Sequence, residues 1–147
     1  MKLLDWPPIW LVGFLVLVFA LDRMVPFGIM GPGGRWIGAG LVVGGIVLML
    51  LAVGQMSRAR TTVIPRRQPD ALVTTGIFQW SRNPIYLGDA MVLAGAILWW
   101  DVPLAAPLLV VFMGVIERRF ILGEEARLRA GFGPAFEAWA ARVRRWI

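Results

Sequence analysis

The chain has 147 residues, of which 59% are hydrophobic, with a net charge of +6 and a mean hydropathy of +0.72. This composition is too apolar for an ordinary soluble fold, so we expect one integral-membrane domain over residues 1–147. The absence of cysteine excludes disulfides and thiolate chemistry, and the absence of histidine removes the commonest metal ligand and general base. We therefore expect no metal. The basic residues flank apolar runs, which favours contact with anionic lipid headgroups over nucleic acid.

Four apolar runs predict an all-α polytopic bundle of about four transmembrane helices, at residues 7–21, 36–56, 84–100 and 102–116. The first run has a competing interpretation as a signal peptide. Residues 1–6, which precede this run, carry one lysine and Asp5, and no small-x-small cleavage site follows the run. We therefore favour a retained membrane anchor. Between the first two runs, residues 22–35 have the glycine and proline content of a loop.

Two features of the apolar runs predict how they pack. Gly40 and Gly44 form a small-xxx-small pair that would let a neighbouring helix approach closely. Asp101 and Pro103 alone separate the third and fourth runs, which predicts a tight helical hairpin.

Arginine placement predicts the orientation. The connection 57–81 and the tail after residue 117 are arginine-rich, so the positive-inside rule places both segments and both termini in the cytoplasm, with a bacterial inner membrane as the expected location. The tail is amphipathic, with Phe132, Phe136 and Trp139 at helical spacing, and predicts a C-terminal helix on the membrane surface or against the site.

The most unusual stretch is 74–88, a polar segment that runs directly into the third apolar run. Asn83, Tyr86 and Asp89 are three residues apart and Arg82 is four before Tyr86, so a helix would place these side chains on one face. Pro84 suits the first turn of that helix. An ion pair between Arg82 and Asp89 that anchors the helix is the alternative interpretation of the same residues.

Several motifs in a fixed order support a family resemblance. They read TTVIP at 61–65, LVTTGIF at 72–78, SRNPIYLG at 81–88, EEARL at 124–128 and FGPAFEAW at 132–139. In joint order and spacing they resemble the isoprenylcysteine carboxyl methyltransferase and phospholipid methyltransferase superfamily, small membrane enzymes that use S-adenosylmethionine. The resemblance covers about residues 61–147, which we expect to be the catalytic part.

The resemblance implies methyl transfer to a lipophilic acceptor, either a prenylcysteine-type carboxylate or a phospholipid amine, with Arg82, Asn83 and Tyr86 as catalytic residues. The family often has histidine where this chain has Asn83, which cannot take up a proton at neutral pH. The implied cofactor-binding residues are Gly76, Arg82, Asn83, Pro84, Tyr86, Gly88, Glu124 and Glu125. We expect the acceptor to enter from within the leaflet, beside the third and fourth runs.

The residues themselves suit this chemistry, because methyl transfer from a sulfonium mainly requires alignment, exclusion of water and an acidic or aromatic surface near the cation. No glycine-rich phosphate loop of the Rossmann kind is present. Glu124 and Glu125 have an alternative interpretation as a solvated helix start. The competing function is a small four-helix transporter or assembly protein, although the first two runs contain no ionisable group of the kind transporters need.

Overall fold

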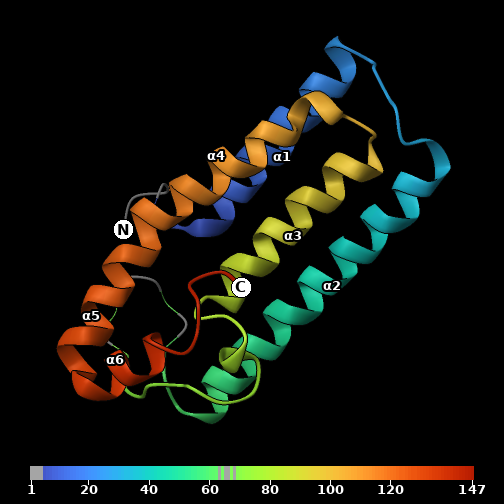
Figure 1. The fold of residues 1–147 in the computed structure, drawn as a ribbon. Coiled ribbons are helices and arrows are strands. Elements are labelled where there is room, and N and C mark those ends of the chain that lie inside the picture. The colour runs from blue at the N-terminus through green and yellow to red at the C-terminus, as the bar shows by residue number, and fades with distance from the viewer. Residues whose placement is uncertain (1–4, 63, 65–66, 68) are drawn as a thin grey trace.

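The computed structural model describes residues 5–62, 64, 67 and 69–147, and this part of the chain is helical without strands (Figure 1), which confirms the predicted all-α class. The long elements are α1 (Pro7–Met24), α2 (Gly31–Arg58), α3 (Pro84–Trp99), α4 (Ala106–Ile116), α5 (Leu122–Phe132) and α6 (Pro134–Ala140). Short 3-10 turns form η2 (Gly76–Gln79) and η3 (Pro103–Ala105), and a π-helical turn, η4 (Glu117–Ile121), joins α4 to α5.

Two helices, α1 and α2, are long and apolar enough to cross a membrane. The apolar helix α3 has 16 residues, and α4 has 11 but continues through η4 into α5 without a break. The α2 helix begins at Gly31, so the prediction of a loop up to residue 35 is wrong by one helical turn. Pro32 occupies the first turn of α2, where its missing N–H is not needed.

The helix α3 is the centre of the bundle. Figure 1 shows α2 along one side of α3 and α1 with α4 along the other, and the contacts between elements agree. On the side of α1 and α4, Phe14, Leu93, Phe112 and Ile116 form a buried apolar cluster. Burial of these side chains on three helices places the start of α3 beside the ends of its neighbours.

Close contact between α2 and α3 depends on two pairs of glycines. A Cβ on Gly38 would lie 2.6 Å from the Gly95 carbonyl oxygen, and a Cβ on Gly45 would lie 2.6 Å from that of Gly88. In both helices the two glycines are seven residues apart, and positions seven apart lie on one face of an α-helix. The backbones therefore approach each other at a distance that a side chain would prevent.

Gly40 and Gly44, the small-xxx-small pair predicted from spacing, do not lie where the backbones of α2 and α3 approach each other. A Cβ on Gly40 would meet nothing within 4 Å, and one on Gly44 would meet only the end of the Met91 side chain. The prediction that these two glycines permit close helix approach is therefore wrong, because the contact follows the seven-residue repeat of Gly38 and Gly45.

The acidic turn after α3 holds the start of α2. The Asp101 carboxylate accepts hydrogen bonds of 3.0 Å from the backbone N–H groups of Ile29, Met30 and Gly31. Asp101 itself has a φ of 56°, which allows the tight hairpin predicted there. The backbone donors, beginning with Ile29, lower the pKa of Asp101. A charged cap from the neighbouring hairpin explains why α2 begins as early as it does.

The C-terminal part folds back toward the start of α3. The predicted single amphipathic helix is divided into α5 and α6 at Gly133, whose φ is 46°. Phe136 and Trp139 of α6 are buried against Ala52 of α2, so they belong to a second apolar core and do not lie on an open surface. Beyond α6 the chain runs back past α3 (Figure 1).

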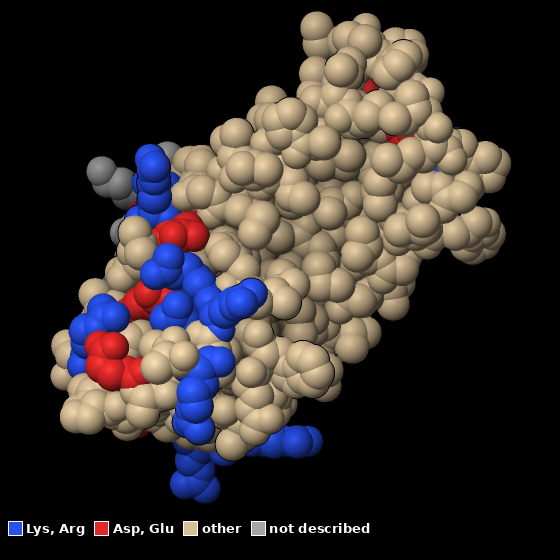
Figure 2. Space-filling model, in the orientation of Figure 1, with Lys and Arg blue, Asp and Glu red and all other residues tan. Residues whose placement is uncertain are grey.

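Charge is distributed unevenly along the bundle. Figure 2 shows lysine and arginine side chains gathered over one end, while most of the remaining visible surface is neither basic nor acidic. We call this the arginine-rich end, which comprises the C-terminal end of α2, the start of α3, α5, α6 and the tail 141–147. The functional motifs of the sequence lie at this same end.

Candidate active site

A cavity of about 300 Å³ opens at the arginine-rich end, within the size range of small-molecule sites. Its walls come from the starts of α1 and α3, the C-terminal part of α2, α5 and the connection between α2 and η2. The charged and polar wall includes Arg82, Asn83, Tyr86, Asp89, Glu124 and Arg127. The apolar wall includes Met49, Val53, Ile85 and Leu128. No described residue of α4 lines the cavity, so the fourth apolar run does not border it.

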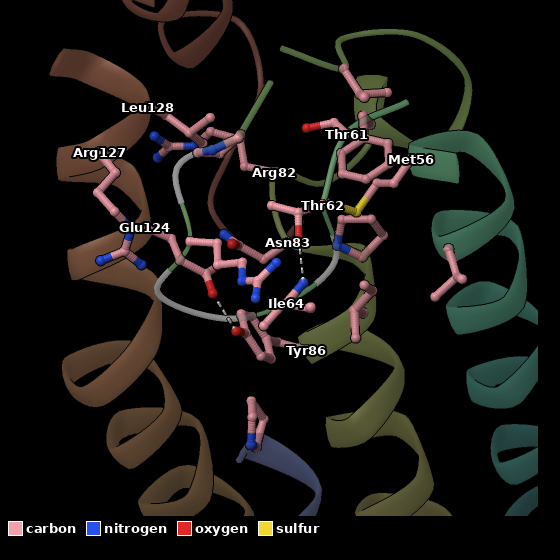
Figure 3. Close-up of a pocket in the computed structure, with 18 of the residues that line it drawn as sticks. Met56, Thr61, Thr62, Ile64, Arg82, Asn83, Tyr86, Glu124, Arg127 and Leu128 are labelled. Atoms are coloured by element: carbon pink, nitrogen blue, oxygen red, sulfur yellow. Dashed lines mark hydrogen bonds between the residues drawn. The ribbon is translucent and has the colours of Figure 1, made fainter. Parts of the chain in front are cut away.

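A hydrogen bond across the cavity joins two of the sequence motifs. The Tyr86 hydroxyl donates to Glu124 Oε1 at 2.7 Å, and Figure 3 shows the two side chains pointing toward each other from α3 and α5. Burial raises the pKa of the Glu124 carboxyl, while the hydrogen bond from Tyr86 and the charge of Arg127 act in the opposite direction. Residues separated by 38 positions thus form one polar group inside the cavity.

The second carboxylate of the pair, Glu125, lies outside the cavity lining. Its side chain is buried, with 6% of the residue exposed, and it contacts Arg82 Nη1 at 3.1 Å and Arg145 Nη2 at 2.8 Å. The interpretation of Glu124 and Glu125 as a solvated helix start is therefore wrong. The two neighbours have different environments, because consecutive helical residues point in different directions.

An ion-pair network attaches the C-terminal tail to the core of the site. Besides Glu125, Arg145 contacts Glu117 Oε1 at 2.7 Å, and the Trp146 indole N–H donates to Glu117 Oε2 at 3.1 Å. Hydrogen bonding to Glu125, followed by the charges of Glu125 and Glu117, raises the pKa of Arg145 against the opposing effect of burial. An arginine stays protonated throughout the physiological pH range, so these ion pairs do not depend on its titration.

Asn83 connects the start of α3 to the same tail. Its side-chain N–H₂ donates to the Arg145 carbonyl oxygen at 3.0 Å, and its backbone N–H donates to Ser81 Oγ at 3.1 Å. The Arg82 N–H donates to the Arg144 carbonyl oxygen at 3.0 Å. Asn83 lines the cavity, but its amide is engaged in positioning the tail, and its catalytic role stays a prediction.

The other predicted site residues fall into two groups. Pro84 lines the cavity in the first turn of α3. Gly76 and Gly88 do not line it. Gly76 has a φ of 58°, and a Cβ there would collide with the Gln55 side chain, whereas Gly88 packs against α2 as described above. Packing thus explains why a glycine occupies each of these two positions, and their binding of a cofactor stays a prediction.

The ion pair considered between Arg82 and Asp89 does not form. Arg82 pairs with Glu125, which leaves Asp89 without a hydrogen bond or ion pair to any residue in the part of the chain that the structure describes. The interpretation of these two residues as a helix anchor is wrong.

Some lining residues were missed by sequence reasoning. Arg127 and Leu128 lie three and four positions after Glu124, so the helical spacing of α5 was a usable signal for them. Met49, Val53 and Met56 had no such signal, since their place in the cavity depends on where α2 crosses α3.

The threonine-rich motif at 61–65 contributes part of the wall. The Thr61 hydroxyl accepts hydrogen bonds from the backbone N–H groups of Asp70 and Ala71, at 3.1 and 3.2 Å, and so holds a turn of the connection in place. Thr62 accepts one from the Ile64 N–H at 3.0 Å (Figure 3). Val63 and Pro65, which complete the motif, lie outside the described residues.

The donor set of the cavity suits S-adenosylmethionine. Glu124 is a carboxylate for an ammonium or ribose hydroxyl, the arginines suit a carboxylate, and Tyr86 and Phe78 provide aromatic surface. Within residues 5–62, 64, 67 and 69–147, no group of three or more acidic side chains is arranged to hold a metal ion.

Comparison with known protein families identifies the family of this chain. The sequence model of the phospholipid methyltransferase family matches residues 34–135, which include most of α2 and all of α3, α4 and α5, and therefore both Tyr86 and Glu124. No curated protein and no solved structure gives a match. Because the match covers more than half of the chain, the protein belongs to the phospholipid methyltransferase family, within the superfamily that its motifs predict.

Proposed function

We propose that this protein transfers the methyl group of S-adenosylmethionine to a lipophilic acceptor, a prenylcysteine-type carboxylate or a phospholipid amine, at the cytoplasmic face of the membrane. Family membership supports methyl transfer to a lipid-type acceptor. The observation that carries the proposal is the Tyr86–Glu124 hydrogen bond, since it brings two separate motifs together inside one cavity.

The cofactor, when bound, supplies a methyl group on a positively charged sulfur. Glu124 is placed to bind its ammonium or ribose hydroxyl groups, and Arg127, on the same face of α5, to bind its carboxylate. Tyr86 holds the Glu124 carboxylate in position and offers an aromatic ring to the sulfonium. Arg82 and Asn83 complete the proposed catalytic set by joining the start of α3 to the tail.

The proposed topology has four membrane crossings in a single domain over residues 1–147. They are formed by α1, α2, α3 and the helical segment that begins with η3 and α4. The arginine-rich end then faces the cytoplasm with both termini, in a bacterial inner membrane. This orientation gives the polar cofactor access from the cytoplasm and the acceptor access from the leaflet.

Calorimetric titration of the purified, folded protein with S-adenosylmethionine tests the proposal. We expect saturable binding that weakens in Glu124→Gln and persists in Glu137→Gln, a control in which the removed charge belongs to an exposed pair with Arg129. Labelled cofactor with lipid extracts then identifies the acceptor. Folded protein that binds no cofactor would favour the alternative, a four-helix transporter or assembly protein.

A further inference from the structure

Asp89 is a buried carboxyl group of the cavity that pairs with no described residue. The residue is 4% exposed and lines the cavity, yet it makes no hydrogen bond or ion pair with any described residue. The carboxylates around it differ in this respect, because Glu124 accepts from Tyr86 and Glu125 contacts two arginines. A buried carboxylate is unfavourable unless a counter-charge or donor compensates it, so an unpaired one within a cavity indicates a ligand.

The position of Asp89 separates it from the polar groups of the arginine-rich end. Asp89 lies three residues beyond Tyr86 on the same face of α3, which at about 1.5 Å per residue is roughly 4.5 Å deeper into the bundle. The cavity wall at this depth is apolar, since Met49 lies against neighbouring Gly88 and also lines the cavity. The cavity therefore has a charged end suited to the cofactor and a deeper, apolar part with one carboxylate.

We propose that Asp89 binds the ammonium group of the acceptor and accepts its proton, so that the site selects a lipophilic amine over a lipophilic carboxylate. This inference rests on the proposed methyl transfer. A carboxylate acceptor would bring a second negative charge beside Asp89, which repulsion disfavours. An ammonium would instead compensate the carboxylate, and the hydrocarbon part of the same molecule would contact the apolar wall.

Proton transfer to Asp89 also makes the acceptor reactive. An ammonium nitrogen has no lone pair, so it must lose a proton before it can attack. Transfer to the Asp89 carboxylate frees that lone pair, which forms the new nitrogen–carbon bond as the sulfur–carbon bond breaks and its electron pair stays on sulfur. The product is the methylated ammonium, and the neutral Asp89 then releases its proton to water through the open cavity.

The test compares two probes of equal chain length and opposite charge, dodecylamine and dodecanoate, in nonionic detergent at neutral pH. We expect wild-type protein to bind dodecylamine more tightly by about tenfold or more, as a charge-assisted hydrogen bond implies. Asp89→Asn should lose about ten- to hundredfold in dodecylamine affinity. It should keep the wild-type affinity for S-adenosylmethionine. Asp22→Asn, at the opposite end of α1, is the charge-matched control and should change neither affinity.

Melting temperature is the second measurement. Because Asp89 pairs with no residue that the structure describes, Asp89→Asn without ligand should melt at the wild-type temperature or above it. A lower melting temperature would make the carboxylate structural and overturn the inference. Unchanged dodecylamine affinity in Asp89→Asn would also overturn it, as would a loss of S-adenosylmethionine affinity, which would assign Asp89 to the cofactor.

If Asp89→Asn does not fold, the affinities of wild-type protein for dodecylamine and dodecanoate still test the inference. Equal affinity for the two probes, or preference for dodecanoate, overturns the assignment of Asp89 while saturable binding of S-adenosylmethionine leaves the proposed function intact. Failure to bind S-adenosylmethionine, with the amine preference retained, refutes methyl transfer instead.

Discussion

Replacing Glu125 with Gln removes a buried negative charge that two arginines share, whereas the same change at Glu124 removes a charge from the cavity. Glu125 holds Arg82 at 3.1 Å and Arg145 at 2.8 Å, so loss of its charge weakens the attachment of the C-terminal tail to α5. Glu124 contacts Tyr86, and a Gln side-chain oxygen can still accept that hydrogen bond. Adjacent residues are thus expected to give different phenotypes, the first in stability and the second in cofactor binding.

The magnitudes follow from burial. Removing one partner of a buried ion pair costs about 3–5 kcal/mol of unfolding free energy. The Arg82 side chain is 14% exposed, but that of Arg145 is 30% exposed and keeps Glu117 as a partner. We therefore expect about 2–4 kcal/mol for Glu125→Gln. Glu124→Gln should cost about 1 kcal/mol or less, because it exchanges a charged for a neutral hydrogen bond.

Equilibrium unfolding in mixed micelles, followed by circular dichroism, measures the first effect, and calorimetric titration with S-adenosylmethionine measures the second. Glu137→Gln is the matched control, since its pair with Arg129 has side chains that are 56% and 52% exposed and contributes at most about 1 kcal/mol. Equal destabilisation by Glu124→Gln and Glu125→Gln would refute the reasoning, as would a Glu125→Gln protein no less stable than the control.

Three further predictions test the helix packing, the acidic turn and the orientation. Gly45→Ala should destabilise the protein by about 1–3 kcal/mol through overpacking, while Gly40→Ala, on the open face of the same helix, should leave it unchanged or about 0.5–1 kcal/mol more stable in thermal unfolding. The pKa of Asp101 is lowered by its backbone donors, so its contribution is complete above the unfolded value of about 4 and is lost as pH falls through the folded value. Melting temperatures measured across acidic pH should therefore fall more steeply for wild type than for Asp101→Asn. In this cysteine-free chain, a membrane-impermeant maleimide added to intact cells should label Phe27→Cys and not Ala141→Cys.

Each of these predictions has a contradicting outcome. Equal effects at Gly45 and Gly40 would mean that close helix contact does not follow the seven-residue repeat. Parallel pH profiles of the melting temperature for wild type and Asp101→Asn would show that the Asp101 carboxylate does not act as a charged cap of α2. Labelling of Ala141→Cys from outside, with disrupted cells as the control for reactivity, would reverse the orientation.

Local patterns in the sequence were sufficient to predict the all-α class and the helix face that lines the cavity. Hydrophobic runs predicted the apolar helices, and the spacing of Asn83, Tyr86 and Asp89 predicted one face of α3, which lines the cavity in the structure. The family resemblance, which rests on motif order, is confirmed by the match over residues 34–135. These features depend on residues near one another in the chain, and helical periodicity makes them readable.

Tertiary structure decided which residues share a contact and which do not. Spacing alone could not show that α2 meets α3 through Gly45, because several glycine pairs of that helix have a permissible repeat. Nor could it separate Glu124 from Glu125, whose roles diverge only when α5 faces α3 on one side and the tail on the other. That Asp89 pairs with no described residue is likewise a property of the assembled cavity, because it depends on every element packed around the side chain.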